Sequence, residues 1–290
     1  MDKIAIASGK GGVGKSMLTS SLAILFSREK RITAVDCDVD APNLAIWLAE
    51  AEEWKKIRKI SVSEKPIIDN SRITSERAEK CVEKCRFKAL ELKEGKLKLN
   101  PFLCEGCGAC EVFCPQGTIK MKPVQSGEIK VKETKYSFPL VSGQLYPGET
   151  GSGKVVTEIK KEAEKTSSDL MLIDSAPGTG CPVIASLQDS NFVVLITEPT
   201  PSGFADLKRV LKVVDHFKLP FALVINKWDI NKELSREMEK WSGENFLGKI
   251  SYDKKIFQTL ADLKPVLETD LKIKGEIKEI FNNLKLWLDR

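Results

Sequence analysis

Short apolar runs alternate with longer segments of helical spacing along most of the chain. Residues 4–7 predict a buried β-strand, and the apolar positions of residues 17–26 predict a helix after it. Four further apolar runs predict strands at residues 31–36, 170–173, 192–197 and 221–226. One apolar face over residues 277–288 predicts a terminal helix that packs on the sheet. This alternation is typical of an α/β fold with a doubly wound, mostly parallel sheet.

Composition narrows the class of protein. The chain has 290 residues, 42% apolar and 30% charged, which suffices for one large α/β domain and a small second one. We expect a cytoplasmic protein without a membrane partner, because no apolar stretch is long enough to span a bilayer and no signal peptide precedes the first strand. The net charge of +5 is mild and its lysines are scattered among glutamates, so we expect no nucleic-acid partner.

A glycine-rich loop follows the first predicted strand. Residues 8–16 read Ser-Gly-Lys-Gly-Gly-Val-Gly-Lys-Ser, in the strand–loop–helix context of a phosphate-binding loop. Backbone N–H groups there converge on an anion, Lys15 neutralises the β- and γ-phosphates, and Ser16 is the expected Mg²⁺ ligand. The residues expected to contact the nucleotide are Gly11, Gly12, Val13, Gly14, Lys15, Ser16 and Met17.

The second lysine of this loop, Lys10, resembles the signature lysine of the MinD/ParA-type P-loop ATPases with a deviant Walker A motif. That branch includes the nitrogenase iron protein and the Mrp-type iron–sulfur carriers. The resemblance implies a P-loop NTPase fold and an ATP-dependent homodimer. It also implies that Lys10 is catalytic and acts in trans on the partner's nucleotide, like an arginine finger.

Carboxylates follow two of the predicted strands. Asp36, Asp38 and Asp40 alternate after one strand, and Asp174 ends another before a loop rich in glycine and proline. Ligands bind at such strand ends in doubly wound sheets. By resemblance to the switch I and Walker B segments of the family, Asp38 orients the attacking water, while Asp36 and Asp174 support Mg²⁺ through water.

Two further segments resemble the base pocket of this family. Asn226 ends the strand at residues 221–226 and is expected to contact adenine, which favours ATP. Pro199 lies in a Glu-Pro-Thr-Pro segment after the strand at residues 192–197 and is expected to form a wall of the same pocket.

A second glycine-rich segment, residues 148–155, fits most of the same phosphate-loop spacing. Val155 stands where the Mg²⁺-binding hydroxyl should be, and no strand clearly precedes the segment. We therefore expect a loop that leads into a helix.

Eight cysteines in such a chain indicate metal or redox chemistry. The run Cys104-x-x-Cys107-x-x-Cys110-x-x-x-Cys114-Pro is that of bacterial ferredoxins and favours an iron–sulfur site over zinc or a structural role. A degenerate copy lies upstream and keeps only its last two cysteines, Cys81 and Cys85.

In two-cluster ferredoxins the fourth cysteine of each run ligates the other cluster. Cys85, Cys104, Cys107 and Cys110 therefore form the predicted ligand set of one [4Fe–4S] cluster. Cys81 and Cys114 are left over, as a disulfide or as buried thiols. Cys181 resembles a cluster ligand of the nitrogenase iron protein, but a second such cysteine is missing, so we interpret it as a packing residue.

These predictions combine into an ATPase domain, residues 1–60 and 140–290, with an inserted small α+β ferredoxin-like domain, residues 61–139. Three functions are compatible with the combination. The first is an ATP-gated redox protein that acts on an unknown redox or iron–sulfur acceptor protein. The second is an iron–sulfur assembly or carrier ATPase. The third is a positioning ATPase at a membrane or nucleoid, with the ferredoxin unit as a sensor.

Overall fold

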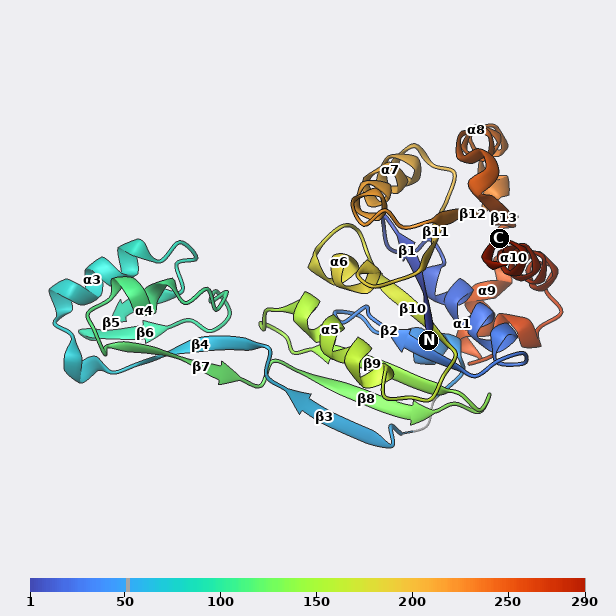
Figure 1. The fold of residues 1–290 in the computed structure, drawn as a ribbon. Coiled ribbons are helices and arrows are strands. Elements are labelled where there is room, and N and C mark those ends of the chain that lie inside the picture. The colour runs from blue at the N-terminus through green and yellow to red at the C-terminus, as the bar shows by residue number, and fades with distance from the viewer. Residues whose placement is uncertain (51–52, 290) are drawn as a thin grey trace.

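A nine-stranded sheet carries the long buried segments of the chain (Figure 1). The computed structural model describes residues 1–50 and 53–289. In chain order the strands of this sheet are β1 (Asp2–Ser8), β2 (Ile32–Asp36), β3 (Lys56–Ile60), β8 (Gly127–Glu133), β9 (Pro139–Leu145), β10 (Leu170–Pro177), β11 (Phe192–Thr197), β12 (Phe221–Asn226) and β13 (Phe246–Ile250). Their order across the sheet is β13-β12-β11-β1-β10-β2-β9-β8-β3. Neighbours from β13 to β9 are parallel, and β8 is antiparallel to β9 and β3.

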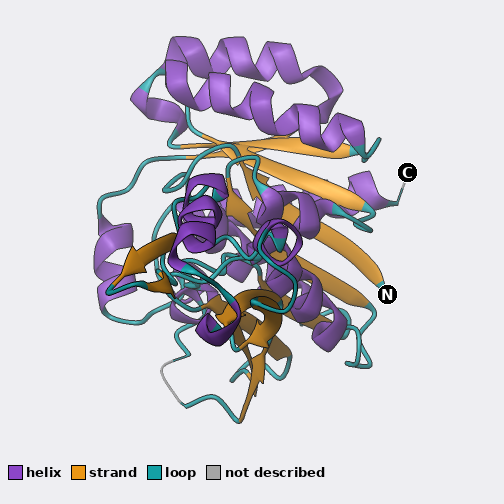
Figure 2. Ribbon diagram, turned by 90° about the vertical axis from the view of Figure 1, so that its left-hand side faces the viewer, coloured by secondary structure: helices purple, strands orange, loops and turns teal. Residues whose placement is uncertain are grey.

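Helices cover both faces of this sheet (Figure 2). The helices that belong to it are α1 (Lys15–Phe26), α2 (Leu44–Trp47), α5 (Ser152–Ala163), α6 (Cys181–Leu187), α7 (Pro201–His216), α8 (Lys232–Ser242), α9 (Lys255–Ala261) and α10 (Ile273–Leu288). Short 3-10 turns lie at Trp228–Ile230, Gly243–Asn245 and Val266–Glu268. Alternate residues of β1 enter two separate cores, Ile4 and Ile6 with α1 and α10, Ala5 and Ala7 with α5, α6 and α7. The predicted doubly wound, mostly parallel fold is confirmed.

The terminal helix α10 packs on the sheet as predicted. Its apolar face lies in the core, where Phe281 is 5% exposed and its ring meets that of Phe26 edge-on at 4.8 Å. Trp287 meets Phe192 of β11 at the same centroid distance, 4.8 Å. Among the described helices, none combines the length and apolar character that crossing a bilayer requires.

The chain leaves the large sheet between β3 and β8 to form a separate body, which we call the cysteine lobe (residues 63–124). The antiparallel ribbon of β4 (Ser63–Ile68) and β7 (Ile119–Val124) carries it away from the sheet (Figure 1). The rest of the lobe is a 3-10 turn (Asn70–Arg72), α3 (Ser75–Lys84), the hairpin of β5 (Leu90–Lys93) and β6 (Lys96–Leu99), and α4 (Ala109–Phe113).

The lobe is shorter than the expected inserted domain of residues 61–139. The difference is β8, which lies inside that range but pairs with both β9 and β3. Its residue Ile129 is 1% exposed and packs in the core that α5 covers. Burial of this face therefore keeps β8 in the large sheet.

The second glycine-rich segment does follow a strand, so the expectation that no strand precedes it is wrong: β9 ends at Leu145. The segment leads from a loop into α5, as expected. This helix begins at Ser152, so Gly153 and Lys154 already lie in its first turn. In the first glycine-rich loop, by contrast, α1 begins at Lys15, directly after Gly14. The backbone of the second segment thus differs from that of a phosphate-binding loop.

Truncation of one α10 side chain tests the packing of the terminal helix. Phe281→Ala should lower the free energy of unfolding by about 3–5 kcal/mol, because it leaves a cavity beside Phe26. Leu286→Ala on the same helix, at a residue that is 66% exposed, should change it by less than about 0.5 kcal/mol. Urea unfolding measures both, and equal effects would contradict a packed helix.

Candidate functional site

The glycine-rich loop is held in place by the strand that ends beside it. Gly14 caps α1 with φ 93°, a left-handed conformation that favours glycine. The Asn226 side chain at the end of β12 donates from Nδ2 to the Val13 carbonyl at 2.8 Å, and a Cβ on Gly14 would collide with that amide. Asn226 therefore supports the loop in addition to lining its pocket.

Lys15 and Asp174 form a buried ion pair under this loop. Lys15 Nζ lies 2.9 Å from Asp174 Oδ1, and the Thr19 hydroxyl donates to the same oxygen at 2.9 Å. Burial lowers the pKa of Lys15, but the Asp174 carboxylate more than offsets this and raises it above the usual value. Asp174 Oδ2 is buried and has no hydrogen-bond partner. An orphaned carboxylate oxygen of this kind fits a cation or its bound water.

Asp36, the last residue of β2, lies next to Asp174 because the two are register partners; β10 continues past Asp174 to Pro177, beyond the strand end expected at Asp174. The Asp36 carboxylate accepts hydrogen bonds from the backbone N–H groups of Leu44 at 2.9 Å and Asp38 at 3.1 Å. Burial, and then the charge of Asp174, raise the pKa of Asp36 to about 7. Two adjacent buried carboxylates with Ser16, itself 7% exposed, supply the oxygen donors that Mg²⁺ prefers.

Asp38 is half-buried and lines the same cavity as the glycine-rich loop. Burial raises the pKa of its carboxyl group above the ordinary value. The neighbouring Cys37 is fully buried, and burial together with Asp36 raises the pKa of its thiol to about 12. Cys37 is therefore an inert packing residue.

Lys10 lies against its own chain. Its ammonium group is 2.6 Å from Glu198 Oε1 and within 3.5 Å of the Thr200 and Ser202 hydroxyls. Lys227 approaches the other oxygen of Glu198 at 2.9 Å. Burial raises the pKa of Glu198, but the hydrogen bonds from the two lysines outweigh this and lower it. The Glu198 carboxylate thus binds the ammonium groups of both Lys10 and Lys227 beside the glycine-rich loop.

A cavity of about 290 Å³ opens over the glycine-rich loop. It is lined both by residues that the sequence predicted and by residues that it did not. Gly11, Gly12, Gly14, Lys15, Ser16, Met17, Asp38 and Asn226 all line it, together with Lys227. The missed residues are Asn43, Trp47, Tyr252, Asp253, Ile256 and Phe257. Val13 is buried beneath the loop, and Pro199 is buried outside the lining set.

Four of the missed residues share one origin, the segment that follows the carboxyl end of β13. Ligands bind at the carboxyl ends of strands in doubly wound sheets, so the place of these residues after β13 could have predicted that they line the cavity. Phe257, a large apolar side chain, is 71% exposed beside the cavity. Apolar and aromatic groups of this kind form the wall that a nucleotide base requires.

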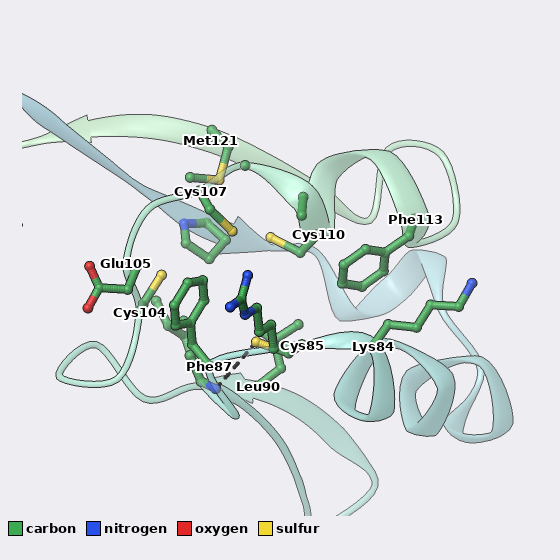
Figure 3. Close-up of a pocket in the computed structure, with 16 residues that line it drawn as sticks. Lys84, Cys85, Phe87, Leu90, Cys104, Glu105, Cys107, Cys110, Phe113 and Met121 are labelled. Atoms are coloured by element: carbon green, nitrogen blue, oxygen red, sulfur yellow. Dashed lines mark hydrogen bonds between the residues drawn. The ribbon is translucent and has the colours of Figure 1, made fainter.

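Figure 3 shows the sulfurs of Cys85, Cys104, Cys107 and Cys110 facing one space in the cysteine lobe. Cys85 directly follows α3, Cys104 and Cys107 lie in the loop before α4, and Cys110 lies in α4. The Ala89 N–H points at Cys85 Sγ, 3.4 Å away. Burial, and then the neighbouring Cys104 and Cys107, raise the pKa of Cys110. The structure therefore brings together the four predicted cluster ligands.

The spacing of these sulfurs is open rather than tight. Among the described residues, no three His, Cys, Asp or Glu side chains gather closely enough to hold one metal ion. A [4Fe–4S] cubane, however, binds each cysteine through a different iron, so its ligands surround a larger group. Four cysteines around a common cavity fit that arrangement better than a single-ion site.

Cys81 and Cys114 form a disulfide between α3 and the end of α4, with Cα atoms 5.6 Å apart. Both residues are buried in the small core of the cysteine lobe. Of the two alternatives left open by the sequence, the structure therefore has the disulfide. Cys181, the first residue of α6, is free and exposed, so the expectation that it is a packing residue is wrong for its own side chain.

Comparisons with known proteins agree with this geometry. Residues 4–266 match the family described as the CobQ/CobB/MinD/ParA nucleotide binding domain. An uncharacterized protein of Methanocaldococcus jannaschii is 38% identical over 98% of this chain and 96% of its own length. The iron–sulfur cluster carrier protein of Pyrococcus abyssi is 23% identical over 87% of this chain and 75% of its own length.

The solved structure of the cell division ATPase MinD from Pyrococcus furiosus matches the fold. Its TM-score is 0.59 at 16% identity, and the match covers 99% of both chains. The glycine-rich loop, the buried Lys15–Asp174 pair and the family match span the same nucleotide-binding core. The chain therefore belongs to the CobQ/CobB/MinD/ParA family of nucleotide-binding P-loop proteins.

Proposed function

We propose that this protein is an ATP-hydrolysing iron–sulfur protein that works as a nucleotide-gated redox switch. The observation that carries the proposal is the convergence of Cys85, Cys104, Cys107 and Cys110 on one cavity of a lobe attached to a P-loop core. A set of four cysteines is complete for a cubane. A cluster with all four ligands can stay bound to the protein, and a permanently bound cluster can transfer electrons.

The nucleotide is bound by the residues around the cavity over the glycine-rich loop. Loop amides and Lys15 receive the phosphates, while Tyr252 and Phe257 stand where the base would stack. Mg²⁺, which neutralises phosphate charge when bound, would be held by Ser16 directly and by Asp36 and Asp174 through water. Asp38, at the edge of the same cavity, accepts a hydrogen bond from the attacking water and orients it.

Lys10 supplies the link between ATP and dimerisation in this proposal. In the free chain its ammonium group is neutralised by Glu198 at 2.6 Å. Lys227 shares Glu198, so the carboxylate keeps a cationic partner when Lys10 leaves. We propose that Lys10 moves from Glu198 to the phosphates bound by a second copy, where it stabilises the charge that develops on hydrolysis.

The cysteine lobe holds the redox group. Cys85, Cys104, Cys107 and Cys110 would ligate one [4Fe–4S] cluster, which supplies one-electron transfer when bound. The buried Cys81–Cys114 disulfide ties α3 to the end of α4, so the segments that carry Cys85 and Cys110 keep their spacing. Cys107 is exposed and places one edge of the site at the surface, where an acceptor protein can approach.

A carrier or assembly ATPase is the second candidate. Relatives named iron–sulfur cluster carrier proteins match this chain at 22–23% identity, and exposure of Cys107 would let a cluster leave. Transfer of iron to an apo-ferredoxin distinguishes the candidates. A carrier loses its iron to the apo-protein in an ATP-dependent way, whereas a redox switch keeps it.

Electron paramagnetic resonance of the anaerobically purified, dithionite-reduced protein tests the proposed function. We expect about four iron atoms per chain and one [4Fe–4S]⁺ signal that shifts or changes its reducibility with ATP and Mg²⁺. Cys107→Ser should lower the iron content, and Cys181→Ser, outside the ligand set, should retain it. About eight iron atoms per chain would contradict a single cluster, and a signal insensitive to nucleotide would contradict gating.

Substitutions in the glycine-rich loop separate binding from hydrolysis. Lys15→Ala should weaken ATP binding about 100-fold or more, because it removes the phosphate partner and strands Asp174. Lys10→Ala and Asp38→Ala should leave binding largely intact and slow hydrolysis about 100-fold or more. Lys154→Ala, in the second glycine-rich segment, is the matched control and should change neither. Calorimetry measures ATP binding, and phosphate release measures hydrolysis. ADP production at the native rate by Lys10→Ala or Asp38→Ala would refute the role of that residue in hydrolysis.

The buried carboxylates predict a pH-dependent stability without nucleotide or Mg²⁺. Since the pKa of Asp36 is raised to about 7, the folded chain binds more protons than the unfolded chain between about pH 4 and 7. The free energy of unfolding should therefore fall as the pH rises through this window, by at most about 1.4 kcal/mol per pH unit. Asp36→Asn should remove this contribution, and Asp40→Asn, at an exposed position nearby, should keep it. Urea unfolding measures this free energy at each pH. The same pH dependence in the native chain and in Asp36→Asn would contradict the assignment.

A further inference from the structure

The second glycine-rich segment contacts the cysteine lobe through a buried ion pair. Lys65 of β4 lies 2.6 Å from Glu149, and their side chains are only 9% and 16% exposed. Lys65 Nζ also donates to the Gly148 carbonyl at 3.2 Å and to the Pro101 carbonyl at 3.0 Å. One ammonium group thus joins the connecting loop (residues 148–151) to the cysteine loop (residues 101–107).

Two further contacts reinforce this junction. The Thr150 hydroxyl donates to the carbonyl of Glu105, next to Cys104, at 3.4 Å. Gly148 has φ +77°, and a Cβ there would stand 2.6 Å from the Phe102 ring. Side chains other than glycine rarely adopt this conformation, and a Cβ would displace the ring. A shift of the connecting loop would therefore carry Pro101, Phe102 and Glu105 with it.

At its other end the connecting loop enters α5, which is joined to α6. A Cβ on Gly153 would lie 3.0 Å from the Cys181 carbonyl oxygen, so the first turns of the two helices are in close contact. Lys160 of α5 reaches the far end of α6, where it donates to the carbonyls of Ala185 at 2.9 Å and Ser186 at 3.3 Å. Burial lowers the pKa of Lys160. The two helices are thus held together at both ends.

Helix α6 continues directly from the nucleotide site. β10 carries Asp174 and ends at Pro177, which lines the nucleotide cavity, and α6 begins at Cys181. The contacts therefore run without interruption from the nucleotide cavity through α6, α5 and the connecting loop to the cysteine loop. Packed elements of this kind can carry energetic coupling between two sites.

We propose that the connecting loop couples the nucleotide state to the cysteine site, with Lys65 and Glu149 as positioning residues for the cysteine loop. The inference rests on the proposed function and names how its two sites communicate. Movement of the segment after Asp174 displaces α6 and α5 together. The connecting loop then shifts the backbone beside Cys104 and changes its exposure.

Hydrogen exchange measured by mass spectrometry on the full-length, cluster-loaded chain tests the coupling, with the midpoint potential as a second readout. With ATP and Mg²⁺, exchange in residues 101–107 of the native chain should change about fivefold or more, and the potential should shift. Lys65→Met and Glu149→Gln should reduce both responses below about twofold while ATP still protects the glycine-rich loop. Lys65→Arg keeps the charge and several donors and should retain them.

Two further variants separate a broken junction from a damaged lobe. Lys160→Met removes the hydrogen bonds that hold α5 to the far end of α6 without touching the cysteine lobe, and it should also reduce the response in residues 101–107 below about twofold. Glu239→Gln is the matched control, because it breaks a 2.8 Å pair with Lys249 far along the sheet, and its response should equal that of the native chain.

The outcomes distinguish this inference from the proposed function. A native-sized response in Lys65→Met or Lys160→Met overturns the coupling route and leaves the redox function standing. A native chain that binds ATP and iron but shows no response in residues 101–107 overturns the coupling as well. Absence of bound iron would instead overturn the proposed function, and exchange in the cluster-free chain would then still decide whether the loops are coupled.

Discussion

The parallel sheet places the carboxyl ends of its central strands at one edge, and this constraint organises the nucleotide site. Asp36 ends β2 and is in register with Asp174 of the neighbouring β10, so two carboxylates are buried side by side. Lys15, delivered by the first turn of α1, neutralises part of this charge at 2.9 Å. One oxygen of Asp174 still lacks a partner, and the pKa of Asp36 is raised. The carboxylate charge that Lys15 does not neutralise makes this edge of the sheet suited to Mg²⁺.

The cysteine lobe is attached to a part of the sheet away from the buried charges of Asp36, Asp174 and Lys15. It leaves the sheet from the side of β3 and β8, at the end opposite β13, and a two-stranded ribbon carries it outward (Figure 1). Its small core has few apolar residues, and the Cys81–Cys114 disulfide lies within that core. A crosslink stabilises so small a body by limiting its unfolded states, and it leaves the four remaining cysteines of the lobe free to face one cavity.

The two sites lie in different parts of the fold, and the elements between them are joined by hydrogen bonds, an ion pair and a close backbone contact. Lys160 and the contact of Gly153 with Cys181 fasten α5 to α6, and Lys65 fastens the connecting loop to the cysteine loop. Glu198 meanwhile holds Lys10 in its own chain, away from any partner. These contacts give the free chain a defined resting arrangement. In the proposed function, nucleotide and a second copy act on this arrangement by competing for Lys10 and for the segment after Asp174.

Features that depend on local spacing could be predicted from the order of residues alone. The strand–loop–helix context around Lys15, the strands that end at Asp36 and Asn226, and the fold class could all be predicted, because short periodic patterns encode them. Contacts that depend on strand order and register emerged from the folded chain. It placed Asn226 on the Val13 carbonyl, Tyr252 and Phe257 beside the cavity, and β8 in the large sheet. It also joined Cys81 to Cys114 and gave the second glycine-rich segment its contacts with Lys65. These partners lie tens to hundreds of residues apart, so no local pattern in the chain records which of them will meet.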